Sequence, residues 1–491
     1  MNKIAKIIIS AVAAVGVVSA AAGIHYGYAK TTDELTSYEI ETNGAPLRVG
    51  VISDLQLPDT TDKDTHQYKS FESTLTMLKN KGMDALIIGG DFTDAGTKKA
   101  WQTYKEIYDK VMADSEKPVP LYILGNHDYW LTDFFSCFEI PTPATQQKRF
   151  TKYTGELPYS HKVINGYHFI CWSSSDGSYD KSYTNKDWIR GELDKAVADD
   201  PSKPIFVITH INPEGTVYGS DEWGNPDITD VLKDYSQVIS LSGHSHFSLI
   251  DERSIWQDSF TAFTTQSLDY IELESGKFNN SVPKDVYGNT LADKLPGCIY
   301  MEIDSDKVVV NRLEANTGNP FKEPWVIEAP FGSAQSLSKY TNNRAETNKA
   351  PVLDENLEVS LSDITDINNN PQKMISFKAG SDDDFVHSYK LEFLDENNNL
   401  LSFDETDYDN HIIHYNSEGE KISFDNKAYG DGEPKKISQL IYFSDYILGL
   451  DNMSETAELR LPSNLPENAK FVVITAIDSW GAESNSVTCE L

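Results

Sequence analysis

Short apolar runs alternate with longer amphipathic segments along the chain from about residue 46 to residue 315. Five of the runs are rich in β-branched residues, which is typical of buried strands: 47–53, 85–89, 121–124, 205–209 and 238–242. Between the first two runs, Phe71, Leu75 and Leu78 repeat at helical spacing, and Gly82 provides a C-terminal stop. This alternation of strand and helix predicts a layered α/β core whose strands pair mostly in parallel.

A short polar cluster follows each of the five runs. The clusters are Asp54-Leu55-Gln56, Gly90-Asp91, Gly125-Asn126-His127-Asp128, His210 and Gly243-His244-Ser245-His246. Open α/β sheets place their binding sites at the carboxyl ends of the strands, so we expect these clusters to converge. A single His or Asp is more often a hydrogen-bonded structural residue. Five clusters in series, however, supply carboxylate, amide and imidazole groups for two metal ions.

Length and charge limit the classes of protein to consider. A chain of 491 residues is long enough for two domains, each with its own core. Lys and Arg together number 42, against 76 Asp and Glu, which gives a formal net charge of −34. Such a surface repels phosphate backbones, so no nucleic-acid polymer is expected as a partner.

The first 29 residues have the layout of a secretory signal. Lys3 and Lys6 precede an uncharged run over residues 7–23, and small residues that suit cleavage follow. The alternative is an uncleaved membrane anchor, because about 17 to 25 apolar residues span a bilayer and this run is at the short end. Both predict a secreted or cell-surface protein, with membrane contact only through this segment if it stays uncleaved.

The pattern changes after residue 315. Residues 316–350 are mostly polar and turn-rich, which predicts a linker. From 351 to 491, alternating runs such as 357–361, 389–393 and 471–476 are separated by Asn, Asp and Gly turns. This spacing predicts an all-β sandwich domain, and residues 476–484 resemble the last hairpin of fibronectin type III-like domains.

Two acidic turns of this C-terminal part, at 381–384 and 404–409, carry several Asp residues. They are candidates for Ca²⁺ binding, but neither fits the EF-hand spacing, and solvated turns are the favoured interpretation. The C-terminal part offers no catalytic cluster. It could bind a surface ligand, pack against the N-terminal part or act as a spacer.

The five clusters resemble the motifs of the calcineurin-like metallophosphoesterase family, which are D-x-H, G-D-x-x-D, G-N-H-D/E, a lone His and G-H-x-H. The resemblance covers residues 46–315 and implies a four-layer α-β-β-α sandwich with the site at the strand ends. It implies a metal-dependent phosphoric ester hydrolase that acts on a phosphate mono- or diester. Two divalent ions about 3.5 to 4 Å apart would activate a bound water and neutralise the phosphoryl charge, so that a metal-bound hydroxide attacks phosphorus.

The resemblance also implies a set of metal ligands. By motif position, the first ion would be held by Asp54, Gln56, Asp91 and His246. The second would be held by Asp91, Asn126, His210 and His244, with Asp91 bridging both. The expected ions are two of Mn²⁺, Fe or Zn²⁺, since the ligand types do not distinguish among them.

His127 and Asp94 have a separate role in the family pattern, in which this His lies beside the phosphate and the Asp orients it. An imidazole held by a carboxylate is suited to donate a proton to the leaving oxygen. The alternative for Asp94 is a cap at the start of the following helix.

Gln56 departs from the family pattern, which usually has His at this position. An amide oxygen is a harder and weaker ligand for transition metals than an imidazole nitrogen. Either Gln56 still binds through its oxygen, or water takes its place in a loosely bound first ion. Ligation is favoured, because Asn126 already supplies an amide oxygen. We therefore predict Mn²⁺ or a similar ion at this position, at less than full occupancy.

An aromatic stretch follows the third cluster: Tyr129, Trp130, Phe134, Phe135 and Phe138, with Lys148, Arg149 and Lys152 beyond it. It is either a loop that contacts the substrate or an apolar cover that packs on the domain.

Two hypotheses for function follow. The first is an exported dinuclear phosphoesterase with a small phosphoester substrate. The second is a surface binding or adhesion protein in which Gln56 has weakened the phosphoesterase core. The ligand set favours the enzyme, but it does not identify the substrate, because pocket shape separates the ester classes.

Overall fold

The computed structural model describes residues 35–130, 142–178, 182–273, 284–291, 293–404 and 436–491, and the backbone of two short strands at 412–415 and 421–422. The predicted signal or anchor, residues 1–29, lies outside the described residues. Every helix within the described ranges is too short or too polar to cross a bilayer.

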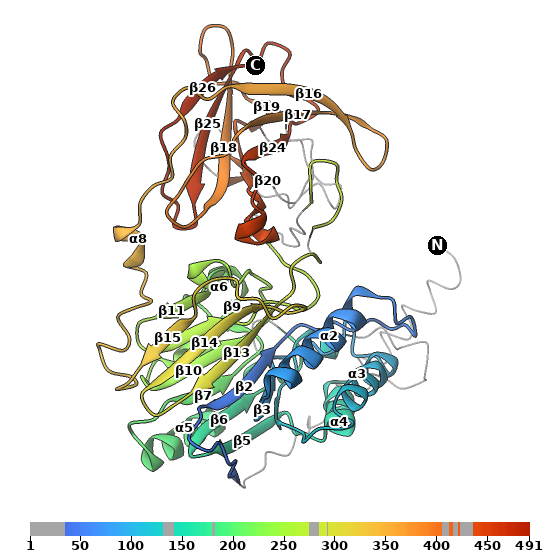
Figure 1. The fold of residues 1–491 in the computed structure, drawn as a ribbon, viewed down its shortest axis with the longest axis vertical. Helices are drawn as coiled ribbons and strands as arrows, with labels where there is room; N and C mark the ends of the chain where they lie inside the picture. Colours follow the sequence, from blue (N-terminus) through green and yellow to red (C-terminus); the bar gives the residue numbers. More distant parts are fainter. Residues whose placement is uncertain are drawn as a thin grey trace, which may run out of the picture.

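Two large sheets form the N-terminal part of the molecule, which we call the α/β domain (Figure 1). The seven-stranded sheet has the order β1 (Thr36–Tyr38), β5 (Tyr159–Ile164), β6 (Tyr167–Trp172), β7 (Ile205–Ile208), β10 (Val238–Ser242), β12 (Thr261–Thr264) and β11 (Ile255–Gln257). The six-stranded sheet has the order β15 (Trp325–Glu328), β14 (Lys307–Glu314), β13 (Gly297–Ile303), β2 (Leu47–Ile52), β3 (Ala85–Ile88) and β4 (Val119–Tyr122). Strands β2, β3 and β4 pair in parallel, as do β6, β7, β10 and β12, so the predicted parallel core is confirmed.

Helices cover the outer face of each sheet. They are α2 (His66–Lys81), α3 (Lys98–Val111) and α4 (Pro143–Thr154) on the six-stranded sheet, and α5 (Lys186–Asp199) and α7 (Pro226–Leu232) on the seven-stranded sheet. Helix α2 ends where predicted, because the positive φ of Gly82 suits a C-terminal cap.

Alternating side chains of the strands build the layers. Val49 and Val51 point into the core between the two sheets, where they join Phe206 of β7. Ile52 lies in the opposite cluster, under α2 and α3. Because a strand alternates its side chains between faces, and both faces of each sheet are covered, the strands are nearly continuous apolar runs. The predicted α-β-β-α sandwich is confirmed.

Strand β15 corrects one boundary. It pairs with β14 through Trp325 to Glu328 and lies inside the stretch 316–350 that the sequence predicts to be a linker. Trp325, Phe331 and Tyr340 are buried in the core between the sheets. The α/β domain therefore extends beyond residue 315, because a few apolar residues in a polar stretch are enough to add an edge strand.

The C-terminal residues from Val359 to Glu490, which we call the β-domain, form antiparallel sheets. One sheet has the order β16 (Val359–Thr365), β17 (Pro371–Lys378) and β24 (Thr456–Arg460). The other has the order β21 (Lys421–Ile422), β20 (Ile412–Tyr415), β23 (Gln439–Phe443), β18 (Val386–Leu394), β25 (Phe471–Asp478) and β26 (Val487–Glu490). Strands β19 (Phe403–Asp404) and β22 (Lys436–Ile437) form a small ribbon.

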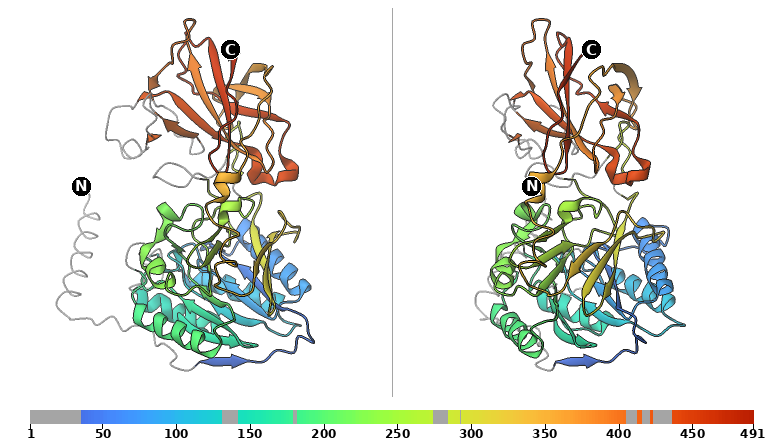
Figure 2. Two further views of the ribbon diagram at one scale, coloured as in Figure 1. Left: turned by 90° about the vertical axis from the view of Figure 1, so that its left-hand side faces the viewer. Right: turned by 60° about the vertical axis from the view of Figure 1, so that its left-hand side comes forward.

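A single apolar core lies between the sheets of the β-domain, with Phe377 of β17, Leu391 of β18 and Ile474 of β25 among its buried members. The predicted all-β sandwich is therefore confirmed. Figure 2 shows the β-domain at one end of the α/β domain, with the short helix α8 (Arg344–Thr347) on the connection between them.

Candidate metal centre

The predicted ligands follow the carboxyl ends of strands in both sheets: Asp54 and Gln56 after β2, Asp91 after β3, Asn126 after β4, His210 after β7, and His244 and His246 after β10. The strands reach the same edge of the sandwich, and the loops after them meet there.

Asp54, Asp91 and His210 form the middle of the group. Each offers one ligand atom, the three atoms lie within 4.8 Å of one another, and all three residues are buried. His210 Nε2 lies 3.2 Å from Asp91 Oδ2 and 3.9 Å from Asp54 Oδ1. Carboxylate oxygens and an imidazole nitrogen at such spacing suit a divalent cation.

Three further predicted ligands lie around this group of three: Asn126, His246 and His244. Asn126 Oδ1 lies 2.9 Å from His210 Nε2, and His246 Nε2 lies 3.1 Å from Asp54 Oδ1. The His244 backbone N–H donates to Asp54 at 3.2 Å, and its ring centroid lies 5.1 Å from that of His210. The structure thus brings these six predicted ligands together through side-chain or backbone contacts.

Backbone carbonyls orient two of the imidazoles. His210 Nδ1 lies 2.8 Å from the carbonyl oxygen of Gly89, and His246 Nδ1 lies 3.1 Å from that of Tyr270. A ring that donates its Nδ1–H to a carbonyl keeps Nε2 as the nitrogen that faces a metal. In both residues Nε2 is the atom nearest the carboxylates.

Five of the predicted ligands have left-handed backbone conformations. The φ angles are 53° for Asp54, 41° for Gln56, 49° for Asp91, 71° for His244 and 56° for His246. Such angles are uncommon outside glycine and cost free energy, and they concentrate at functional sites. Strand-to-loop turns this tight direct the side chains back into the centre.

Two glycines leave room for the carboxylates. A Cβ atom on Gly125 would overlap the Asp91 carboxylate, and a Cβ atom on Gly243 would overlap that of Asp54. The glycines of the G-N-H-D and G-H-S-H clusters are therefore needed for close approach of backbone to carboxylate.

The charges of the group suit a cation. Burial by itself raises the pKa of the Asp54 carboxyl, but the His246 and His210 imidazoles outweigh it and lower that pKa. Burial likewise opposes ionisation of Asp91, yet His210 and His127 hold its pKa well below the usual range. Burial and the neighbouring His210 lower the pKa of His244 to about 3, so this imidazole is neutral. Burial opposes protonation of His210, but Asp91 and Asp54 raise its pKa to about 9, so a bound cation would displace the proton of this ring.

His127 lies beside the centre, next to Asp94. Its Nδ1 is 2.9 Å from the Asp94 carbonyl oxygen and 3.5 Å from the Asp94 carboxylate. Burial lowers the pKa of His127, but Asp91 and Asp94 outweigh it and raise the pKa to about 9. The helix α3 is capped by the side chain of Thr97, so the structure places Asp94 beside His127 and not at the cap.

Gln56 is buried, 2% exposed, and its backbone N–H donates to the Asp91 carbonyl at 2.9 Å. Its side-chain Nε2 has no hydrogen-bond partner. A buried amide without a partner is costly unless something else satisfies it. Rotating the amide by half a turn would direct Oε1 to the same position, where a cation would satisfy it. Asp91 Oδ2 is also buried without a hydrogen-bond donor of its own. The residues present therefore fit a divalent cation.

Sequence reasoning assigned no role to several residues around the centre. Asp128 is buried and accepts hydrogen bonds from the backbone of Thr93 and Gly125, which ties the third cluster to the second. The Tyr270 ring lies 4.3 Å from that of His246, measured between centroids. The Trp223 ring lies 5.7 Å from that of His244. Tyr270 follows the end of β12, so the strand-end rule was the one signal that could have found it.

The aromatic stretch after the third cluster divides between the two roles foreseen for it. Trp130 is 45% exposed, and its ring stacks on that of His127 at 3.7 Å. Tyr129 is buried and donates to the Ser174 carbonyl, and Arg149 is buried and donates to the Gly96 carbonyl. Trp130 thus borders the centre, whereas Tyr129 and Arg149 support the fold. Phe134, Phe135 and Phe138 lie outside the described residues.

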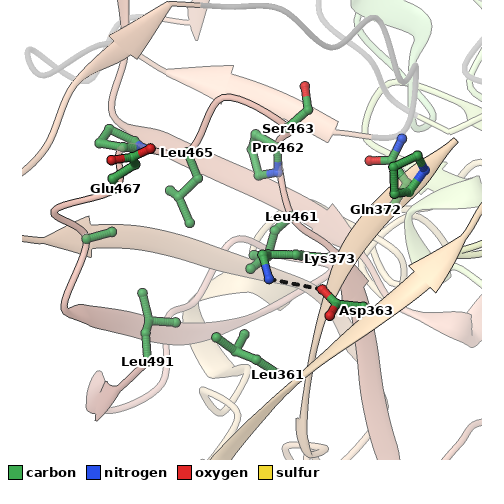
Figure 3. A pocket seen from close by; sticks show the side chains of 13 residues that line it. Leu361, Asp363, Gln372, Lys373, Leu461, Pro462, Ser463, Leu465, Glu467 and Leu491 are labelled. Carbon is green, nitrogen blue, oxygen red and sulfur yellow. Dashed lines mark hydrogen bonds and ion pairs between the residues drawn. The ribbon is translucent and has the colours of Figure 1, made fainter.

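The β-domain contains a cavity of about 470 Å³ beside β16 and β17 (Figure 3). Leu361, Leu461, Leu465 and Leu491 give it an apolar lining, which also includes the Lys373–Asp363 ion pair, at 3.0 Å. None of the residues that line it is a histidine or cysteine. This cavity has no set of groups for hydrolysis.

Residues 47–248 match the family model described as calcineurin-like phosphoesterase. The resemblance that the five clusters predict is confirmed over these residues. The match includes all of the predicted metal ligands of the phosphoesterase domain and both His127 and Asp94. It ends before the β-domain, for which no family is shown.

Solved structures and curated proteins add little to this assignment. A conserved uncharacterised protein (predicted phosphoesterase) from Streptococcus pneumoniae has 11% identity and a TM-score of 0.26, and covers 58% of this chain and 98% of its own. Vacuolar Protein Sorting 29 from Cryptosporidium parvum has 13% identity and a TM-score of 0.29, and covers 58% of this chain and 99% of its own. TM-scores this low support no argument about fold or activity. No curated protein matches the chain.

Proposed function

We propose that this protein is an exported, dinuclear metal-dependent phosphoesterase that hydrolyses a phosphate mono- or diester. The observation that carries the proposal is the convergence of five strand-end clusters from two sheets on one buried group, centred on Asp54, Asp91 and His210. The family match over residues 47–248 supports the same reaction class.

The two ions would be held as the motif positions suggest. Asp54, Gln56 and His246 would hold the first, Asn126, His210 and His244 the second, and Asp91 would bridge them. When bound, two such ions lower the pKa of a bound water and neutralise charge on phosphoryl oxygens.

His127 would act on the leaving group. Its raised pKa, about 9, keeps the imidazole protonated at neutral pH. Because Nδ1 faces the Asp94 carbonyl, Nε2 remains for the substrate. A protonated imidazole there stabilises the phosphoryl oxygens and donates a proton to the departing alcohol. Trp130, stacked on this ring and nearly half exposed, would contact the organic part of the ester.

Export is part of the proposal and rests on the N-terminal sequence, with Lys3 and Lys6 before an uncharged run. Fractionation of expressing cells, with the N-terminus of the recovered protein determined, would test it. Recovery of the uncleaved chain in the cytoplasm would contradict it.

The first experiment compares matched chromogenic phosphate monoester and diester substrates, with the purified protein and added Mn²⁺. The control is Asp91→Asn. Activity that the control abolishes supports the proposal and reveals the ester class. Activity that persists in Asp91→Asn would contradict it.

A surface-binding protein is the second candidate, and the observation that favours it is the cavity of the β-domain, whose lining has no histidine or cysteine. Mn²⁺ bound at the centre, with no hydrolysis of either ester class, would favour this candidate over the enzyme.

A further inference from the structure

The two domains share a buried apolar cluster, which we call the interdomain cluster. Ile250, Ile271 and Leu273 come from the α/β domain, and Tyr446 and Ile447 come from the β-domain. Each is at most 3% exposed. Burial this complete resembles a domain core more than a transient contact, so the β-domain is held in one position on the phosphoesterase domain.

Polar contacts surround the interdomain cluster. Arg253, which pairs with the buried Asp251, lies 3.2 Å from His387 of the β-domain. Lys322 forms an ion pair with Asp384 across the same interface. Directional contacts of this kind set the orientation of the two domains, which the views in Figure 2 show end to end.

One segment of the α/β domain, residues 267–273, connects the interdomain cluster to the metal centre. The Tyr270 carbonyl accepts from His246 Nδ1 at 3.1 Å, and the Glu272 backbone N–H donates to the His246 carbonyl at 3.2 Å. Ile271 follows Tyr270, Leu273 follows Glu272, and both belong to the interdomain cluster. The ring of Tyr270 also packs on His246, at 4.3 Å between centroids, so adjacent residues of this segment contact His246 and the interdomain cluster.

The start of the segment is fixed differently. The Leu268 backbone N–H donates to the Ser53 carbonyl at 3.2 Å, and Ser70 Oγ donates to the Leu268 carbonyl at 3.0 Å. These partners belong to the α/β domain itself. The Tyr270 carbonyl, which orients His246, therefore lies between two fixed points. One is Leu268, held by the α/β domain, and the other is the interdomain cluster, which needs the β-domain.

We infer that the β-domain is a positioning element of the first metal site, because its packing on Ile271 and Leu273 holds the Tyr270 carbonyl that orients His246. The inference rests on the proposed metal centre but on no particular substrate. Loss of the hydrogen-bond partner that orients a metal-ligating histidine typically lowers metal affinity or activity about 10- to 100-fold.

The two metal sites should then respond differently to a loosened interface. His210, in the second site, is oriented by Gly89, which follows β3 of the six-stranded sheet. The first site already has the weak ligand Gln56 and depends on His246. Loosening the interface should weaken the first ion and leave the second unchanged.

The test measures Mn²⁺ binding to the full chain by isothermal titration calorimetry, with and without Ile447→Ala. Ile447 lies in the interdomain cluster and touches no predicted ligand. The matched control is Leu459→Ala, which removes a buried side chain from the core of the β-domain itself. We expect Ile447→Ala to weaken one Mn²⁺ per chain about tenfold, and Leu459→Ala to lower only thermal stability.

A double-mutant cycle with Leu273→Ala sharpens the test. Because Leu273 and Ile447 belong to one cluster, their effects on the affinity for the first Mn²⁺ should be non-additive. Ile447→Val should restore most of the affinity. If Ile447→Ala fails to fold, Phe385→Leu in the same cluster replaces it, and the same outcomes apply.

Unchanged affinity for both ions in Ile447→Ala, or equal weakening by the Leu459→Ala control, would overturn the inference. These outcomes differ from a failure of the proposed function, which would be Mn²⁺ binding without hydrolysis by the wild-type protein. A wild-type protein that binds no Mn²⁺ would overturn both.

Discussion

The metal centre and the acidic turns of the β-domain are both rich in aspartate, yet their carboxylates are used in different ways. Asp54 is buried, and imidazoles lower its pKa against the effect of burial. Asp366 lies half-buried in a surface turn, and the backbone N–H groups of Asn370 and Asn368 in that turn lower its pKa. Asp395 repeats this arrangement with Asn397 and Asn399.

The difference teaches that convergence, not the number of carboxylates, makes a cation site. In the turn at 381–384, Asp382 accepts from the Asp384 backbone N–H, and Asp383 pairs with Lys349 at 2.9 Å. One oxygen of each carboxylate is thus engaged by a nearby donor of the protein, whereas Asp382 Oδ2 has no hydrogen-bond partner. Asp54 and Asp91, by contrast, come from different strands and face each other across buried imidazoles. Solvated turns stay a prediction at 381–384, and residues 405–409 lie outside the described residues.

Among variants that distinguish the metal centre from the turns of the β-domain, Asp91→Asn should have the largest effect on hydrolysis. Removing the charge of the bridging carboxylate should reduce hydrolysis at least about a thousandfold, because a metal ion contributes several kcal/mol and each 1.4 kcal/mol is tenfold in rate. Steady-state kinetics and Mn²⁺ titration check it. Retention of more than about a tenth of the activity would place the centre elsewhere.

Gly125→Ala should have the next largest effect. The added Cβ overlaps the Asp91 carboxylate and must displace it. A displacement of about 1 Å at a reacting site costs on the order of a hundredfold in rate. Gly191→Ala is the matched control, since a Cβ there meets nothing within 4 Å in helix α5. That variant should keep full activity and fold at least as stably as the wild type.

Gln56→His tests the departure from the family pattern. An imidazole should bind the first ion more tightly than the amide, on the order of tenfold. The left-handed backbone at this position, with φ of 41°, is one that His tolerates better than most residues. Metal analysis after purification should show higher occupancy in Gln56→His. Full occupancy in the wild type, unchanged by Gln56→Ala, would show that the amide is not a ligand.

The contact between the two domains can be tested through the pH dependence of stability that His387 confers. Burial and the neighbouring Arg253 lower the pKa of His387 to about 3. The unfolded chain binds a proton at this residue below about pH 6.5, whereas the folded chain does not until about pH 3. Stability from this residue is therefore complete above about pH 6.5 and decreases as pH falls toward 3.

The matched variant is His387→Gln, which keeps an acceptor for Arg253 but does not titrate. Between about pH 7.5 and about pH 5.5, the wild type should lose on the order of 1 kcal/mol more unfolding free energy than the variant. Urea titrations at both pH values measure the difference. Equal losses would show that His387 does not contribute.

The smallest effect is expected from Asp366→Asn in the β-domain. An asparagine oxygen can accept the same backbone N–H groups, so the turn should persist. Mn²⁺ affinity and hydrolysis should equal those of the wild type. A measurable loss of bound metal would show that this turn is a cation site after all.

Much of the fold and of the centre was predictable from local sequence. The apolar runs ending at residues 53, 89 and 242 correspond to β2, β3 and β10, because strands buried on both faces are continuous apolar runs. Asp54, Asp91 and His244 follow those runs, so their convergence was foreseen from strand direction alone.

Other features depend on contacts between residues far apart in the sequence, and no local sequence pattern predicts them. The strand β15 pairs through four residues in a polar stretch, so its assignment needed the neighbouring strand β14. Tyr270 belongs to no ligand class, and its importance comes from a carbonyl that any residue carries. His387 and Arg253 are 134 residues apart.

The sequence by itself determined the chemical groups of the centre, their order along the chain and the sheet edge at which they meet, because apolar periodicity dictates where strands end. Tertiary structure alone decided which carbonyl orients each imidazole and which domain supports that carbonyl. The physical reason is that backbone groups are the same in every residue. Their roles depend on the position that long-range packing, such as that of Ile271 against Ile447, gives them.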